Sequence, residues 1–194
     1  PFVETLIPLD TENARDQKLA HSPTARVPVL RTDGFPIWDS LAICEYLAET
    51  FPDRRLWPTT PNLRARARSL CAEMHSGFVD LRTRMPMNCR ARHSPQDRGD
   101  GVARDIARIT QAWVETRAEF GSDGPFLFGE FSIADAFFAP VASRFVTYSI
   151  ELDEVASTYR DTLLELPPMR EWLQAAADEP MAAMTQPSSV PAEA

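Results

Sequence analysis

The sequence predicts a small α/β domain followed by an all-helical domain. Three observations lead to this prediction. Strand-like runs are confined to residues 2–38, helical patterns fill the chain from residue 63 onward, and a stiff, proline-containing segment lies between them. A chain of 194 residues is long enough for two small domains with conventional apolar cores.

The chain opens with a predicted strand and a predicted helix. Residues 2–7 are mostly apolar and typical of a strand. Residues 11–20 are polar and compatible with a helix, and Asp10 or Thr11 is available to cap its N-terminus. The α/β domain therefore begins in the order β-α.

A β-hairpin is predicted next. Residues 27–30 and 35–38 are two short apolar runs, and the turn residues Asp33 and Gly34 lie between them. An Asp-Gly pair between two such runs is a strong hairpin signal, because both residues tolerate the backbone conformation of a tight turn. We therefore expect two paired antiparallel strands.

A helix is predicted over residues 39–47, directly after the hairpin. Asp39 or Ser40 supplies an N-cap. An apolar stripe at helical spacing is formed by Leu41, Ile43, Cys44 and Leu47. The order of elements in the first domain is then β-α-β-β-α.

The domain boundaries follow from changes in composition and from the positions of proline and glycine residues. We place the α/β domain at residues 1–56, a linker at 57–62, the helical domain at 63–186 and a disordered tail at 187–194. The helical domain is expected to contain helices over residues 63–84, 101–120, 132–146, 155–164 and 169–177.

Composition and charge exclude several classes of protein. The net charge of −8 disfavours nonspecific nucleic-acid binding, and no apolar stretch approaches the ~20 residues of a membrane span. Cys44, Cys71 and Cys89 are an odd number without CxxC spacing, which favours reduced thiols and a cytoplasmic location. No His, Cys and carboxylate cluster has metal-site spacing, so we expect no metal.

One middle segment is strongly basic despite the acidic total. Residues 54–108 contain twelve arginines and five acidic residues. A basic wall of this kind could attract a small anionic ligand. The alternative is a solvated helix face, because most surface charges serve only solvation.

Three short motifs together resemble the soluble, bacterial-type glutathione S-transferase family. They lie at residues 26–30 (RVPVL), 38–47 (WDSLAICEYL) and 131–135 (FSIAD). Each motif alone is weak, but their order and spacing are specific, and the resemblance covers nearly the whole chain. It implies a thioredoxin-like N-terminal domain, truncated at its start, followed by an all-α helical bundle.

The resemblance implies a glutathione-binding site in the first domain. It implies a cis bond between Val27 and Pro28, whose turn presents the backbone N–H and C=O of Val27 to the cysteinyl part of glutathione. Asp39 and Ser40 would hold the γ-glutamyl end, because a helix N-terminus favours a carboxylate. The alternatives are an ordinary trans proline and a plain N-cap.

The resemblance also assigns roles in the helical domain. The helix from residue 63 onward lines the co-substrate pocket in the family, which makes His75, Arg82 and Arg90 candidates for that wall. Each could equally be an ordinary surface or core residue. Ser132 and Asp135 form a capping box at the start of a helix, and their role is structural in either interpretation.

No catalytic residue is expected in this chain. Glutathione transferases stabilise the glutathione thiolate with a Ser, Tyr or Cys near their first strand and helix. By the resemblance, both elements would precede Pro1, so we expect the chain to be a fragment or to lack its beginning.

The function implied by the resemblance is glutathione transfer to a small apolar electrophile, as in detoxification, by a cytoplasmic homodimer. Glutathione would be the co-substrate. A first alternative is glutathione-dependent isomerisation of an unsaturated diacid, of the maleylacetoacetate isomerase kind, for which the basic segment would have a use. A second alternative is a non-catalytic module of the same fold that acts in stress sensing or protein interaction.

Overall fold

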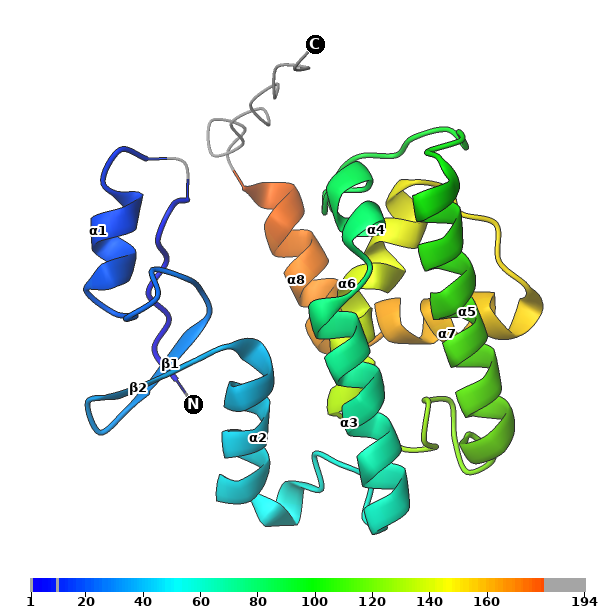
Figure 1. Cartoon of the computed structure of the whole chain (residues 1–194), viewed down its shortest axis with the longest axis horizontal. Helices are drawn as coiled ribbons and strands as arrows, with labels where there is room; N and C mark the ends of the chain where they lie inside the picture. Colours follow the sequence, from blue (N-terminus) through cyan, green and yellow to red (C-terminus); the bar gives the residue numbers. More distant parts are fainter. Residues whose placement is uncertain (1, 10, 180–194) are drawn as a thin grey trace. The chain divides into compact units, whose positions relative to one another are not determined.

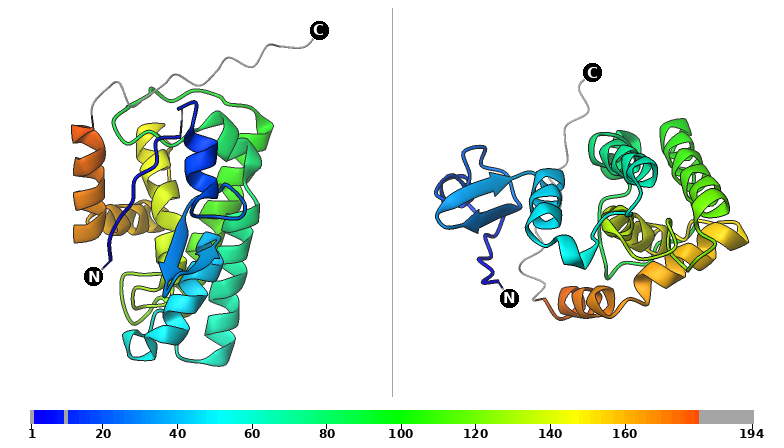
Figure 2. Two further views of the ribbon diagram at one scale, coloured as in Figure 1. Left: turned by 90° about the vertical axis from the view of Figure 1, so that its left-hand side faces the viewer. Right: turned by 90° about the horizontal axis from the view of Figure 1, so that it is seen from below.

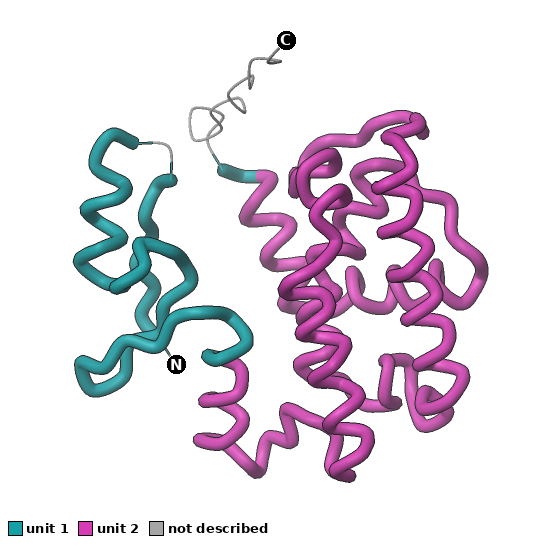
Figure 3. Tube along the Cα trace, viewed as in Figure 1, with its two compact units in different colours: residues 1–43, 178–194 teal, residues 44–177 magenta. Residues whose placement is uncertain are grey.

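The protein is described by a computed structural model that covers residues 2–9 and 11–179 (Figure 1). The chain divides into two compact units (Figure 3). Unit 1 contains the chain up to Ile43 together with the residues from Asp178 onward, and unit 2 is Cys44–Ala177. The predicted tail at 187–194 lies outside the described residues.

Unit 1 contains the predicted hairpin. Strands β1 (Val29–Thr32) and β2 (Phe35–Trp38) pair antiparallel, with Val29 opposite Trp38 and Thr32 opposite Phe35. The turn residues Asp33 and Gly34 have φ angles of 48° and 80°. Positive φ at both positions is what a two-residue hairpin turn requires, so the Asp-Gly signal predicted this element correctly.

The predicted strand at residues 2–7 is wrong, because the structure has no strand there. A strand needs a hydrogen-bonded neighbour, and β1 and β2 pair only with each other in the described part of the chain. The predicted helix at 11–20 exists in shorter form as α1 (Ala14–Leu19). Thr11 does not cap this helix, since Asn13 occupies the N-cap position, and Asp10 lies outside the described residues.

Unit 2 is built from helices (Figure 2). Helix α2 (Ser40–Thr50) crosses the boundary between the two units and is followed by a short 3₁₀ turn, η1 (Pro52–Arg54). The remaining helices are α3 (Pro61–Ser76), α4 (Val79–Arg84), α5 (Asp100–Phe120), α6 (Ile133–Thr147), α7 (Glu154–Leu164) and α8 (Pro167–Asp178). Helices α3 and α5 run along nearly the same direction and α7 runs across them (Figure 1, Figure 2).

The predicted helices of the second domain are largely confirmed, with one break. The helix predicted over 63–84 is interrupted between α3 and α4, where Phe78 has a left-handed φ of 57°. Gly77 precedes it and ends α3. The amphipathic pattern continues across this break, so periodicity alone predicts one helix where the backbone forms two.

The core of unit 2 surrounds α6, which packs against α3 and α7. Trp113 of α5 is fully buried and contacts three aromatic rings, those of Phe138, Phe145 and Tyr159, at centroid distances of 4.9 to 5.7 Å. Aromatic clusters of this kind bury large apolar areas. Within the described residues, no helix is long and apolar enough to cross a membrane.

Candidate functional site

The hairpin register brings the two predicted glutathione-binding motifs together. Val29 begins β1 and lies opposite Trp38, the last residue of β2. Pro28 and Asp39 are the residues that directly flank this last pair of the hairpin. Residues eleven positions apart in the sequence therefore meet at the open end of one hairpin.

Val27 presents an exposed backbone at this open end. The residue is 50% exposed, and the Val27–Pro28 peptide bond is cis, as the family resemblance implies. Within the described part of the chain, neither the N–H nor the C=O of Val27 makes a hydrogen bond. An unpaired N–H and C=O on one residue can pair with the backbone of a peptide ligand, as an added strand would.

Asp39 caps helix α2. Its Oδ1 accepts hydrogen bonds from the N–H groups of Leu41 and Ala42, at 2.9 and 3.4 Å. Asp39 also has a φ of 78°, a left-handed conformation that is uncommon outside glycine and often marks functional positions. The capping interpretation of Asp39 is therefore realised in the structure, and it is compatible with a second role in binding.

Ser40 is the first residue of α2 and is half-buried. Among the residues that the structure describes, its N–H and its hydroxyl have no hydrogen-bond partner. These two donors lie at the positive end of a helix of eleven residues. This end of α2 can therefore accept a carboxylate group.

The three predicted co-substrate residues lie in unit 2, and two of them meet. His75 is exposed in the last turn of α3, with its ring 6.3 Å from that of Phe137. The guanidinium of Arg82 donates to the main-chain carbonyl of His75 at 3.3 Å. Arg90 lies apart and donates from Nε to the carbonyl of Ala176 in α8, at 2.5 Å.

The capping box is present and fully buried. Asp135 Oδ2 accepts from the N–H of Ser132 at 2.8 Å and from its hydroxyl at 3.0 Å. Oδ1 accepts from the N–H of Leu127 at 3.1 Å and from the hydroxyl of Tyr159 at 2.9 Å. Burial raises the pKa of Asp135, and these four hydrogen bonds oppose the shift. Asp135 therefore joins three segments of the helical unit and has no access to a ligand.

Sequence reasoning overlooked Arg144 in the last turn of α6. Its guanidinium is half-buried and donates to the carbonyls of Met85 and Pro140, at 3.0 and 3.3 Å. Burial lowers the pKa of Arg144, and the neighbouring positive charge of Arg82 lowers it further. The available signal was an arginine inside the otherwise apolar pattern of residues 133–147.

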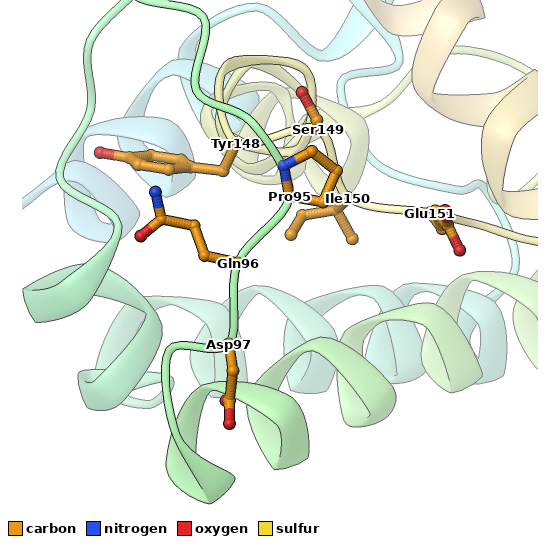
Figure 4. A pocket seen from close by; sticks show the side chains of 7 residues that line it. All are labelled: Pro95, Gln96, Asp97, Tyr148, Ser149, Ile150 and Glu151. Atoms are coloured by element: carbon orange, nitrogen blue, oxygen red, sulfur yellow. The ribbon is translucent and has the colours of Figure 1, made fainter.

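A separate surface pocket of about 370 Å³ lies beside the segment after α6 (Figure 4). It is lined by residues 95–97, from the loop before α5, and by residues 148–151. The ring of Tyr148 stacks on His93 at 4.9 Å and lies 4.4 Å from the guanidinium carbon of Arg98. None of the residues proposed from the sequence lines this pocket. In residues 2–9 and 11–179 we also find no group of three metal-ligating side chains.

Two sequence families match the chain. The family described as "Glutathione S-transferase, N-terminal domain" matches residues 1–50, and "Glutathione S-transferase, C-terminal domain" matches residues 100–175. Among curated proteins, a probable maleylacetoacetate isomerase of Caenorhabditis elegans is 41% identical over 75 residues, which are 39% of this chain and 35% of that protein. The maleylacetoacetate isomerase of Rattus norvegicus is 45% identical over 60 residues, 31% of this chain and 28% of that protein.

Solved structures show the same fold. Glutathione S-transferase 1-6 from Anopheles dirus has a TM-score of 0.72 at 16% identity and covers 92% of this chain and 84% of its own. A glutathione transferase homolog from Burkholderia, solved with bound glutathione, has a TM-score of 0.65 at 24% identity, with coverages of 85% and 80%. Given matches to both domains of one family and this shared fold, the chain belongs to the soluble glutathione S-transferases, with a thioredoxin-like N-terminal domain and a helical C-terminal domain.

Proposed function

We propose that the protein binds glutathione at the open end of the β1–β2 hairpin and takes part in transfer of its thiol to a small apolar electrophile. The observation that carries the proposal is the hairpin register, which pairs Val29 with Trp38 and so brings the adjacent residues Pro28 and Asp39 to the same end of the hairpin. It gathers an unpaired backbone edge at Val27 and a helix N-terminus at Ser40 within unit 1. These two features suit the backbone of a short acidic peptide and the carboxylate at one of its ends.

Each of the four residues has a distinct part in this site. The N–H and C=O of Val27, held by Pro28, pair with the backbone of the cysteinyl residue. The hydroxyl and N–H of Ser40 donate to the γ-glutamyl carboxylate, and the charge of Asp39 attracts the γ-glutamyl ammonium. Glutathione is thereby oriented with its thiol free to react.

We assign none of the described residues to activation of the glutathione thiol. The thiol of Cys71 is unsuited to such chemistry, because it is buried and burial raises its pKa to about 12. The four binding residues can hold and orient the peptide, but they carry no group placed to stabilise a thiolate.

Glutathione affinity of a Ser40→Ala variant tests the site. We expect the dissociation constant from calorimetric titration to rise by roughly tenfold, because two charge-assisted donors become one. A Ser69→Ala variant is the matched control, since Ser69 lies exposed on α3 and bonds only its own helix. Equal affinities in the wild type and Ser40→Ala would contradict the assignment.

A second candidate is glutathione-dependent isomerisation of an unsaturated diacid. The identities of 41% and 45% to proteins named maleylacetoacetate isomerase favour it, and so does the basic segment at residues 54–108. In such a reaction the thiol adds to a double bond, the new single bond rotates, and the thiol leaves again. Glutathione is therefore regenerated, whereas conjugation consumes it. Measuring free thiol during turnover separates the two reactions.

The third possibility is a binding module without catalysis. A stringent starvation protein A homolog of Haemophilus ducreyi is 22% identical over 151 residues. Retained glutathione binding without either reaction in the purified protein would favour this role. We further propose that the protein is a cytoplasmic homodimer, which light scattering coupled to size-exclusion chromatography tests directly through the molar mass.

A further inference from the structure

Two of the three cysteines lie on neighbouring helices of unit 2. Cys71 lies on α3 and is fully buried, and Cys44 lies on α2 and is half-buried. Helices α2 and α3 are joined through η1 and run in opposite directions (Figure 1). Neither thiol takes part in the glutathione site proposed above.

An ion pair fixes which residues of the two helices meet. Glu45 of α2 and Arg68 of α3 are joined by two hydrogen bonds of 2.7 Å each. Cys44 directly precedes Glu45, and Cys71 follows Arg68 by three positions, which is nearly one helical turn. Because the helices are antiparallel, a step back along α2 and a step forward along α3 lead to the same level. The two cysteines therefore lie at one level, next to the ion pair.

The electrostatic surroundings of Cys71 agree with this placement. Burial, and after it the nearby groups Cys44, Asp135 and Glu45, raise the pKa of Cys71 to about 12. The two groups of α2 that act on Cys71 are thus the ones that the ion pair brings to it. The thiol of Cys71 is protonated at neutral pH, whereas Cys44 is the thiol that a solute can reach.

We propose that Cys44 and Cys71 form a reversible disulfide bond on exposure to a small disulfide such as oxidised glutathione. The thiolate of Cys44 attacks one sulfur of the small disulfide, forms a mixed disulfide and releases one molecule of small thiol. Cys71 then loses its proton and attacks the Cys44 sulfur, and the second small thiol leaves with a proton. The protein gives up two electrons and two protons, and the small disulfide is reduced to two thiols.

The different exposure of the two sulfurs sets this order. Exchange begins at Cys44, because Cys71 is fully buried. The second step is the slower one, because only a small fraction of Cys71 is thiolate. Reversible disulfides of this kind suit a redox-sensing role in a reducing compartment. The bond would fasten α3 to the helix whose first residue is Ser40.

Thiol counting in a mixture of reduced and oxidised glutathione tests the pair. The reduced chain has three thiols, and we expect two of them to be lost. Cys89 should stay a thiol, because excess reduced glutathione reverses a mixed disulfide at a single cysteine. Tryptic peptides 32–54 and 69–82, which contain Cys44 and Cys71, should appear in mass spectrometry as one cross-linked species that reduction separates.

The small disulfide 2-hydroxyethyl disulfide should produce the same bond. It lacks the peptide groups of glutathione, so the reaction does not depend on occupation of the site at Ser40. Bond formation with this reagent in a protein that fails to bind glutathione would support the cysteine pair and contradict only the proposed function.

Three variants separate an exchanging pair from ordinary packing. After brief exposure to oxidised glutathione alone, Cys71→Ala should stop at the mixed disulfide on Cys44. Cys44→Ser should keep Cys71 as a thiol, because no solute reaches it. Cys89→Ser is the matched control and should still form the cross-link. Thermal unfolding shows whether each fold is kept, and Cys44→Ser remains informative if Cys71→Ala unfolds.

Three results would overturn the pair. The first is a wild-type chain that keeps all three thiols in both reagents. The second is a cross-link that joins Cys89 to either of the other cysteines. The third is a Cys44→Ser chain in which Cys71 is lost as fast as in the wild type.

Discussion

At the residue scale, one substitution can separate the cap that Asp39 provides from the binding role that we propose for it. Its Oδ1 caps α2 through the N–H of Leu41, and an asparagine oxygen can cap equally well. We therefore expect Asp39→Asn to change the free energy of unfolding by less than about 0.5 kcal/mol. The dissociation constant for glutathione should rise by about tenfold, because the attraction to an ammonium is lost.

Chemical denaturation and calorimetric titration of the same preparation measure both quantities. Asp39→Ala is the informative comparison, because it removes the cap as well and should cost about 1 kcal/mol of stability. If Asp39→Asn bound glutathione as tightly as the wild type, the carboxylate would be a cap and nothing more.

Asp135 is predicted to make stability depend on pH in an unusual direction. Burial raises its pKa above the ordinary value of 3.8, so between these two values the folded state binds more protons than the unfolded state. Its contribution to the free energy of unfolding therefore falls as pH rises from 3.8 through the raised pKa, and is constant above it.

Asp135→Asn should remove this pH-dependent part of the free energy of unfolding and lower stability by about 2–4 kcal/mol. The reason is that the amide NH₂ group of asparagine would lie opposite hydrogen-bond donors that now bind the carboxyl group. Urea denaturation at a series of pH values measures both effects. Asp161→Asn is the control, since that carboxyl is exposed on α7. An unchanged pH profile in Asp135→Asn would show that another group is responsible.

At the scale of elements, the hairpin turn makes a sharp prediction. Gly34 has a φ of 80°, and no atom lies within 4 Å of where a Cβ would be. Gly34→Ala should therefore destabilise the protein by about 1 kcal/mol through backbone conformation alone, without a steric clash. Asp33→Asn should be nearly neutral, because asparagine tolerates the same conformation. An equal loss of stability in both variants, measured by thermal unfolding, would contradict this explanation.

Much of the element order could be predicted from sequence because its signals are local. The Asp33-Gly34 turn and the Ser132-to-Asp135 capping box each act over a few residues, and both exist in the structure. The strand expected at residues 2–7 failed because a strand depends on a partner elsewhere in the chain. Arg144 was overlooked for a related reason, since its carbonyl and cationic neighbours become visible only when α4 and α6 are packed.

At the scale of the whole molecule, the two units differ greatly in buried core. In the described part of unit 1, Ala14, Ser22 and Ala25 are the buried residues, while unit 2 contains the aromatic cluster around Trp113. Local opening is easiest where few apolar contacts are buried. We therefore expect amide hydrogens of unit 1 to exchange before those of α3 and α6.

Hydrogen exchange followed by mass spectrometry measures this difference peptide by peptide. Adding glutathione should slow exchange in the hairpin, because a ligand that binds only the folded state stabilises it. Exchange of both units at one common rate would instead indicate a single cooperative structure and contradict the expected difference.

The hairpin register also constrains which insertions and deletions the chain can accept. Extra residues between Asp33 and Gly34 would lengthen the loop and leave Pro28 and Asp39 at the same end of the hairpin. A single residue inserted into β2 would instead shift the pairs beyond it by one position and turn Asp39 to the other face. The alignment of the two motifs therefore depends on strand length, and homologous chains with longer turns could keep the same arrangement of Pro28 and Asp39.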